Sequence, residues 1–127
     1  MKNLFKIIIL ISMGLFMNSC YYDAFPVDLD PDVPDPDEEV SYNDDIMPLW
    51  VQCVGCHSGN VPPDLRDEFS YDSLLNGYVI PDDAEASILY QSLLGINGVS
   101  LMPPGSKWPD SKINLVKTWI DQGAKDN

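Results

Sequence analysis

The feature that most constrains this chain is the pentapeptide CVGCH at residues 53–57. It contains two of the three cysteines and the only histidine among 127 residues. Three rare residues at such a spacing seldom arise from composition alone. We therefore expect the domain that contains this motif to fold around whatever the two cysteines and the histidine bind.

Three interpretations of the motif leave part of it unused. A structural zinc ion commonly takes four ligands in two pairs, and no second pair accompanies CVGCH in the sequence. A redox-active dithiol is typical of a βαβ pattern, which the hydrophobic periodicity does not indicate. A disulfide between Cys53 and Cys56 is possible in an oxidising compartment, but it would close a very small loop and stabilise little.

Covalent haem attachment uses all three residues. The spacing of three places both thiols on one side of a helical turn, where they can add to the two vinyl groups of haem. His57 then presents its imidazole to the iron as the proximal ligand. We therefore predict one haem c per chain, bound through Cys53, Cys56 and His57. A carbonyl of Pro62 or Pro63 could accept the Nδ1 proton of His57 and fix its tautomer.

The second axial ligand is indicated by elimination. No other histidine exists, and Met47 and Met102 are the only methionines after residue 19. Met47 lies on the proximal side, in the helix that we expect before Cys53. Met102 lies in the loop SLMPPG, which two prolines stiffen and a glycine allows to turn. We expect Met102 to bind the iron, which raises the reduction potential; a loop methionine that fills a core gap is the alternative.

The N-terminus has the pattern of a lipoprotein signal. Residues 1–19 begin with positive charges and contain an apolar run too short to span a bilayer comfortably. The run ends in Met-Asn-Ser-Cys, which resembles a bacterial lipobox and predicts a lipid on Cys20. Tyr21 after that cysteine favours the outer membrane, facing the periplasm or the cell surface. Ordinary secretion is the alternative interpretation.

Residues 20–40 have the composition of an extended tether. Eight of the 20 acidic residues and four prolines lie between Asp23 and Glu39, and charge repulsion with proline stiffness opposes collapse. Without residues 1–19, the chain has five basic residues against 20 acidic ones. Nucleic acid is therefore not an expected partner, because phosphate binding needs a basic patch.

Residues 41–127 form one small domain, near the lower size limit for a stable core. We predict an all-α fold of about four short helices joined by long loops. One helix leads into Cys53, and another is capped by Ser70 and ends at Asn76-Gly77. A third spans 86–94 after a capping-box spacing of Asp82 and Glu85. The last begins at Asp110 or Ser111, ends at Gly123 and buries an apolar stripe: Ile113, Leu115, Val116, Trp119 and Ile120.

The segments DDIMPLWVQCVGCHSG, LYQSLLG, LMPP and LVKTWIDQGAKDN, in this order, resemble the small secreted cytochrome c domains of Bacteroidetes and Planctomycetes. The resemblance covers nearly all of residues 42–126. It implies the class I-like cytochrome c fold, in which the N- and C-terminal helices pack together near the haem. It also implies Cys53 and Cys56 as thioether sites, with His57 as the proximal and Met102 as the distal ligand.

From these features we expect a monomeric electron-transfer protein rather than an enzyme, which exchanges single electrons with periplasmic or cell-surface redox partners. The domain is itself acidic, with 12 acidic residues against five basic ones, which favours a partner with a basic or apolar docking face. The alternatives are a haem subunit of a larger oxidoreductase complex and a ligand-binding haem sensor, if Met102 does not bind the iron. A haem-free lipoprotein with a structural disulfide is the third.

Overall fold

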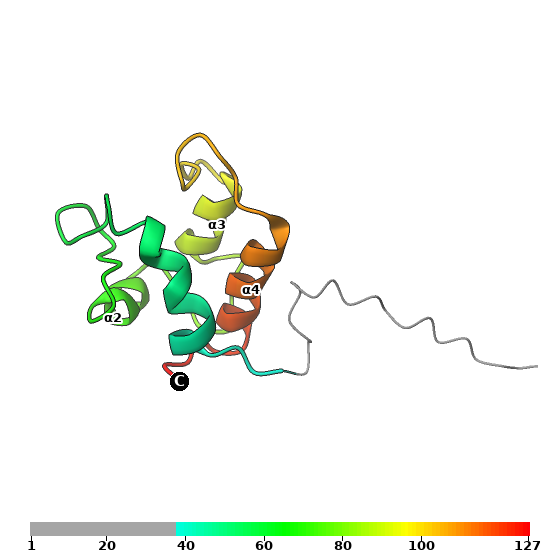
Figure 1. The fold of residues 1–127 in the computed structure, drawn as a ribbon. Helices are drawn as coiled ribbons and strands as arrows, with labels where there is room; N and C mark the ends of the chain where they lie inside the picture. Colours follow the sequence, from blue (N-terminus) through cyan, green and yellow to red (C-terminus); the bar gives the residue numbers. More distant parts are fainter. Residues whose placement is uncertain (1–37) are drawn as a thin grey trace, which may run out of the picture.

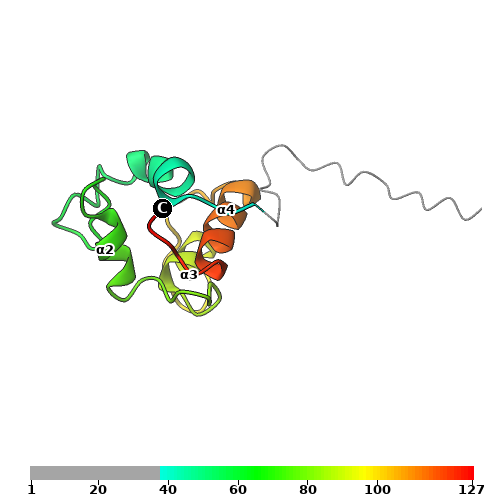
Figure 2. The same ribbon diagram turned by 90° about the horizontal axis from the view of Figure 1, so that it is seen from below.

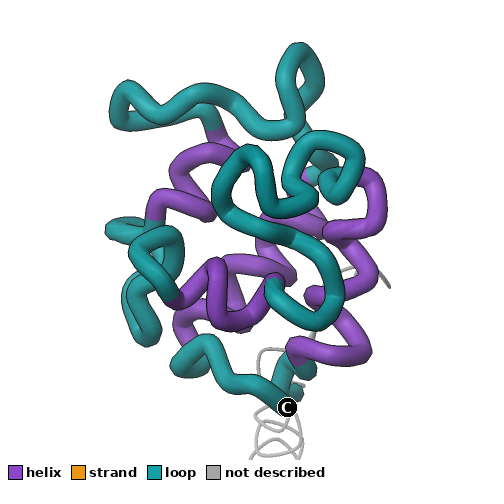
Figure 3. The backbone as a smooth tube through the Cα atoms, turned by 90° about the vertical axis from the view of Figure 1, so that its left-hand side faces the viewer, coloured by secondary structure: helices purple, strands orange, loops and turns teal. Residues whose placement is uncertain are grey.

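The computed structural model describes residues 38–127, and within these residues the fold consists of helices and loops without strands (Figures 1 and 3). The helices are η2 (Tyr42–Ile46), η3 (Met47–Gln52), α2 (Ser70–Leu75), α3 (Ile88–Leu94) and α4 (Asp110–Asp121). Because η3 follows η2 directly, residues 38–127 contain four helical stretches. The predicted all-α class is confirmed; the predicted signal peptide, Cys20 and most of the tether lie outside the described residues.

The helical stretch that leads into the motif is irregular. Ser41 caps it, since its hydroxyl accepts a hydrogen bond from the Asp44 N–H at 3.2 Å. The first segment, η2, is a π-helix, and the second, η3, is a 3-10 helix with Pro48 in its first turn. Ile46 and Trp50 are buried. The stretch thereby presents its apolar side to the core and directs the chain toward Cys53.

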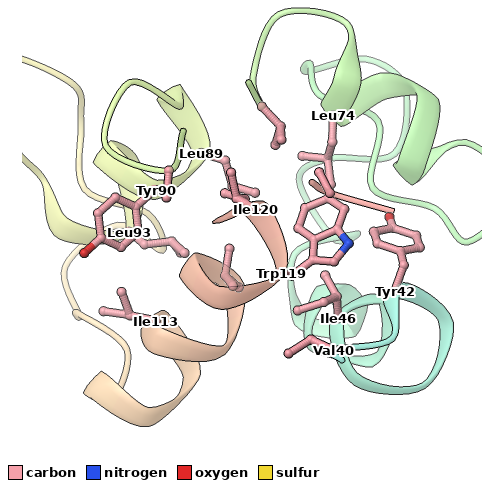
Figure 4. Close-up of a cluster of buried hydrophobic side chains, with 14 of the residues drawn as sticks. Val40, Tyr42, Ile46, Leu74, Leu89, Tyr90, Leu93, Ile113, Trp119 and Ile120 are labelled. Carbon is pink, nitrogen blue, oxygen red and sulfur yellow. The ribbon is translucent and has the colours of Figure 1, made fainter. Parts of the chain in front are cut away.

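The central helix of the domain is α4, which packs against both α3 and η2. Its buried residues are Ile113, Val116, Trp119 and Ile120, as the apolar stripe predicts. Figure 4 shows the two groups that this stripe joins, with Leu93 and Tyr90 of α3 on one side and Tyr42 and Ile46 of η2 on the other. Gly123, just beyond the helix, has a φ of 98°, which a residue with a side chain rarely adopts.

Two predicted helix caps are wrong. Ser70 lies inside α2, and its buried hydroxyl accepts a hydrogen bond from the Tyr42 hydroxyl at 2.6 Å instead of capping the helix. α3 begins at Ile88 rather than at residue 86, because Asp82 takes a left-handed φ of 66° and residues 84–86 form a turn. At Ser70 a contact beyond the local sequence therefore decides where the hydroxyl points.

Hydrogen bonds join the two ends of the described chain, and Figure 2 shows the C-terminus beside the start of η2. The Val40 N–H donates to Gln122 Oε1 at 2.8 Å, and the Ser41 hydroxyl donates to the Asn127 carbonyl at 2.8 Å. Val40 is only 3% exposed. The packed domain therefore begins at Val40, one residue before the expected boundary.

An aromatic cluster lies beneath this junction. The Tyr42 ring lies 5.1 Å from the rings of both Tyr71 and Trp119, edge-on to the first and tilted to the second. The polar atoms at its edge are paired, since the Tyr71 hydroxyl donates to the Ala124 carbonyl and Trp119 Nε1 donates to the Lys125 carbonyl, both at 2.9 Å. The cluster combines aromatic packing with satisfied hydrogen bonds.

Candidate cofactor site

CVGCH forms one helical turn directly after η3. The Cys53 carbonyl accepts hydrogen bonds from the Cys56 N–H at 3.1 Å and from the His57 N–H at 2.9 Å. Residues three and four positions apart on such a turn lie on the same side. Cys53 and His57 are half-buried, Cys56 is exposed, and both cysteines are free thiols. The turn therefore has the backbone geometry that the spacing of the motif predicts.

The protonation of Cys53 does not favour a redox-active dithiol. Its side chain packs against the core, and this burial, with a smaller contribution from neighbouring Cys56, raises the pKa of the Cys53 thiol above its ordinary value. Reactive dithiols depend on a thiolate whose pKa is lowered by its surroundings. Cys53 is thus held as a neutral thiol at neutral pH.

The imidazole of His57 is oriented by backbone carbonyls. Its Nδ1 atom lies 3.1 Å from the Pro63 oxygen and 3.2 Å from the Val61 oxygen. Carbonyl oxygens only accept hydrogen bonds, so Nδ1 must hold the proton, and in a neutral ring the lone pair lies on Nε2. Of the two prolines that the sequence left open, the structure selects Pro63. The Val61 carbonyl is a second partner that no sequence pattern indicated.

Met102 lies in the loop between α3 and α4, where its backbone is fixed. The Met102 N–H donates to the Ser92 carbonyl at 2.8 Å. Gly95 ends α3 with a φ of 65°, and a Cβ there would lie 3.1 Å from that of Leu101. The Met102 side chain is half-buried and is not among the partly buried groups that pack against the core, whereas Met47 is. This difference disfavours the interpretation of Met102 as a core filler.

Two stacked tryptophans connect the motif to the Met102 loop. The Trp50 ring on η3 lies 6.0 Å from the Trp108 ring, which follows Met102 in the chain, with an interplanar angle of 19°. Figure 1 shows the segment after η3 and the loop before α4 in the half of the domain away from the C-terminus. The fold thus brings the motif and Met102, far apart in the sequence, to the same end of the molecule.

This end also contains buried donors without acceptors. Among the described residues, the indole N–H groups of Trp50 and Trp108 are the buried side-chain polar atoms with no hydrogen-bond partner. The Trp50 indole N–H does lie near the Tyr42 hydroxyl, although without the geometry of a hydrogen bond. The Trp108 N–H is therefore the clearer case, and a buried donor of this kind usually has a partner in the functional protein.

A search of residues 38–127 finds no group of three or more His, Cys, Asp or Glu side chains arranged to share a metal ion. No helix in that range is both long enough and apolar enough to cross a membrane. Comparisons with family models, with curated proteins and with solved structures found no match to this chain. The resemblance to cytochrome c domains therefore stays a prediction, and the function has to be inferred from the residues themselves.

Proposed function

We propose that this protein is a monohaem c-type cytochrome with the cytochrome c fold, which transfers single electrons between redox proteins of the bacterial cell envelope. The observation that supports this most is the CVGCH turn, in which a half-buried thiol, an exposed thiol and an imidazole with an available Nε2 lie on one side of a helical turn. No other interpretation of the motif uses all three groups.

The surroundings of the turn fit a haem. Cys53 and Cys56 would hold the group through thioethers, and His57 would bind the iron through Nε2. Met102, which is half-buried but does not pack against the core, would supply the sixth ligand. The unpaired indole N–H of Trp108 is a donor that a carboxylate of a haem could satisfy.

Bound haem c supplies an iron couple that accepts and releases one electron. The protein's part is to set the ligand field and to limit access of water. The hydrogen bonds from His57 Nδ1 to the Pro63 and Val61 carbonyls strengthen the imidazole as a donor. A thioether from Met102 would raise the reduction potential and leave no open coordination position, which suits electron transfer rather than catalysis.

The first test is to express the full-length chain with a cytochrome c maturation system and to measure its mass and visible spectra. We expect a haem-sized mass increase, a sharp α band in the reduced protein and a band near 695 nm in the oxidised protein, typical of methionine–iron ligation. An increase without the 695 nm band would indicate an open site and favour a sensor. No increase, from a system that matures other cytochromes, would refute the proposal.

The two methionines provide a matched pair for the distal ligand. Met102→Leu should abolish the 695 nm band while the haem stays covalently bound. Met47→Leu should retain the band, since Met47 packs against the core and volume-conserving changes are tolerated there at a cost below about 1.5 kcal/mol. Loss of the band in both variants, or in neither, would contradict the assignment of Met102.

We further propose that a lipid on Cys20 anchors the protein to the outer membrane. Two acyl chains give stable membrane binding, whereas one chain gives only marginal binding. Cys20→Ser should therefore move the protein from the membrane fraction to the soluble fraction without changing the visible spectrum. A protein that stays in the membrane fraction after this substitution would contradict the anchor and leave the haem assignment unaffected.

A further inference from the structure

The loop after CVGCH is closed by an ion pair that no sequence motif indicates. Arg66 Nη2 lies 2.6 Å from Asp64 Oδ2, and Arg66 Nε lies 3.0 Å from Asp64 Oδ1. Gly59 lies against this pair with a φ of 97°, and a Cβ there would lie 3.1 Å from the guanidinium and 3.2 Å from the carboxylate. Arg66 also lies over the Phe69 ring, 4.5 Å from its centre. The Asp64–Arg66 pair thus lies at the end of the loop that follows His57 and packs against Gly59 near its start.

The peptide between Pro63 and Asp64 is held on both sides. Its carbonyl, from Pro63, accepts the proton of His57 Nδ1 at 3.1 Å. Its N–H, from Asp64, donates to the Ser73 hydroxyl on α2 at 2.7 Å. A peptide unit is planar and rigid, so a contact on one side fixes the direction of the other. This single peptide connects α2 to the imidazole of His57.

A backbone hydrogen bond also closes this loop. The Leu65 N–H donates to the His57 carbonyl at 2.8 Å, and the Leu65 side chain is 5% exposed. The Asp64 carboxylate is 18% exposed, and the hydrogen bond from Arg66 lowers the pKa of that carboxyl group below its ordinary value. Asp64 therefore stays ionised at neutral pH and keeps its two-point contact with the guanidinium.

We propose that Ser73, Asp64 and Arg66 are positioning residues for His57: they hold the Pro63–Asp64 peptide in the direction that keeps the imidazole proton on Nδ1 and leaves Nε2 free to bind iron. This inference rests on the proposed function for its purpose but not for its geometry. An imidazole whose Nδ1–H group keeps its hydrogen bond to a carbonyl is a stronger electron donor to oxidised iron. Loosening the peptide should therefore raise the reduction potential.

Two substitutions test this without changing the net charge. Ser73→Ala removes the acceptor of the Asp64 N–H, and Arg66→Lys replaces the planar two-point donor by a point charge. The matched controls are Ser111→Ala on α4 and Lys125→Arg, which lies in an ion pair with Glu39 at the other end of the domain. Because no substitution alters the charge, a shift in potential reports on geometry rather than on a lost charge.

The first measurement is the exchange of the His57 Nδ1 proton with water, followed by nitrogen-15 NMR on the full-length protein as isolated. We expect exchange at least ten times faster in Ser73→Ala and Arg66→Lys than in the wild type and both controls. The second measurement is the reduction potential of the matured protein. A tenfold change in the ratio of oxidised to reduced iron corresponds to ~59 mV for one electron. In both variants we expect the reduction potential to rise by up to this amount.

The exchange measurement does not depend on haem, so it separates the two proposals. If no haem attaches, the proposed function fails while the exchange rates still decide the role of the peptide. If haem attaches but both variants have the proton-exchange rate and the reduction potential of the wild type, the positioning role is refuted and the proposed function stands. Rapid exchange in the wild type would also refute it. If circular dichroism shows that Ser73→Ala does not fold, the test uses Arg66→Lys alone. The Arg66 side chain is half-exposed, so this substitution should not prevent folding.

Discussion

The two ends of this domain differ in how completely their polar groups are paired. At the tail end, where Val40 to Asn43 meet the residues after α4, backbone and side-chain groups exchange hydrogen bonds, and the Trp119 indole has its acceptor. At the motif end, around Trp50 to His57 and the Met102 loop, two thiols are free and the buried Trp108 N–H has no acceptor among the described residues. The difference shows which end has groups left for ordered water or a bound group to satisfy.

The largest effect on stability is expected at the tail end. Trp119 is fully buried between Tyr42 and Tyr71, and truncating a buried tryptophan costs about 3–5 kcal/mol. Trp119→Ala should therefore lower the free energy of unfolding by this amount in urea titrations. Val51→Ala at the motif end, where the side chain is 73% exposed, should stay within about 0.5 kcal/mol of the wild type. Equal losses in both variants would erase the contrast between the two ends.

A smaller effect is expected where α3 gives way to the Met102 loop. An alanine at a left-handed position costs about 1–2 kcal/mol, and at Gly95 the new Cβ would also lie 3.1 Å from that of Leu101. Gly98 is the matched control, because it has a φ of 79° but no neighbour within 4 Å of the added Cβ. Urea unfolding should show a larger loss for Gly95→Ala than for Gly98→Ala. If the two losses are equal, the loop does not pack closely against the helix end.

The next effect concerns Tyr42, and it depends on pH. Tyr42→Phe removes the hydrogen bond to Ser70, which should cost about 1 kcal/mol at neutral pH. Burial raises the pKa of Tyr42 above its ordinary value of 10.0, so the folded chain holds the phenol proton more tightly than the unfolded chain. The resulting stability is present below pH 10 and is lost as the pH rises through the folded pKa. Unfolding between pH 9 and 11 should therefore lose stability less steeply in Tyr42→Phe; parallel curves would contradict this.

The sequence predicted those features that neighbouring residues in the chain determine. The periodicity of α4 predicted the buried face that includes Trp119, and the spacing of CVGCH predicted the turn that the Cys53 carbonyl closes. It failed where a distant residue decides. Ser70 was expected to cap a helix, but its hydroxyl accepts a hydrogen bond from Tyr42, 28 positions away. Likewise, nothing near Asp64 in the sequence indicates that its N–H donates to Ser73. Long-range hydrogen bonds of this kind leave no local pattern.

The Trp50–Trp108 stack was missed for the same reason, since its members lie on separate elements. Both tryptophans are buried. What the sequence did not predict is that the two rings stack and that the Trp108 N–H has no acceptor among the described residues. The structure therefore adds to the motif a buried donor at the same end of the domain.

A substitution at Trp108 tests the contrast between the two ends most directly. Trp108→Phe keeps an aromatic ring against Trp50 but removes an unpaired N–H. In the haem-free chain this change removes a buried donor without a partner, so its cost is only that of the ring volume lost from a buried site. In the haem-loaded protein the cost should be about 1.5–3 kcal/mol larger if the indole donates to a haem carboxylate. Urea unfolding of both forms measures the two costs, and their difference isolates the hydrogen bond from the packing. Equal costs with and without haem would mean that the Trp108 N–H does not donate to the haem.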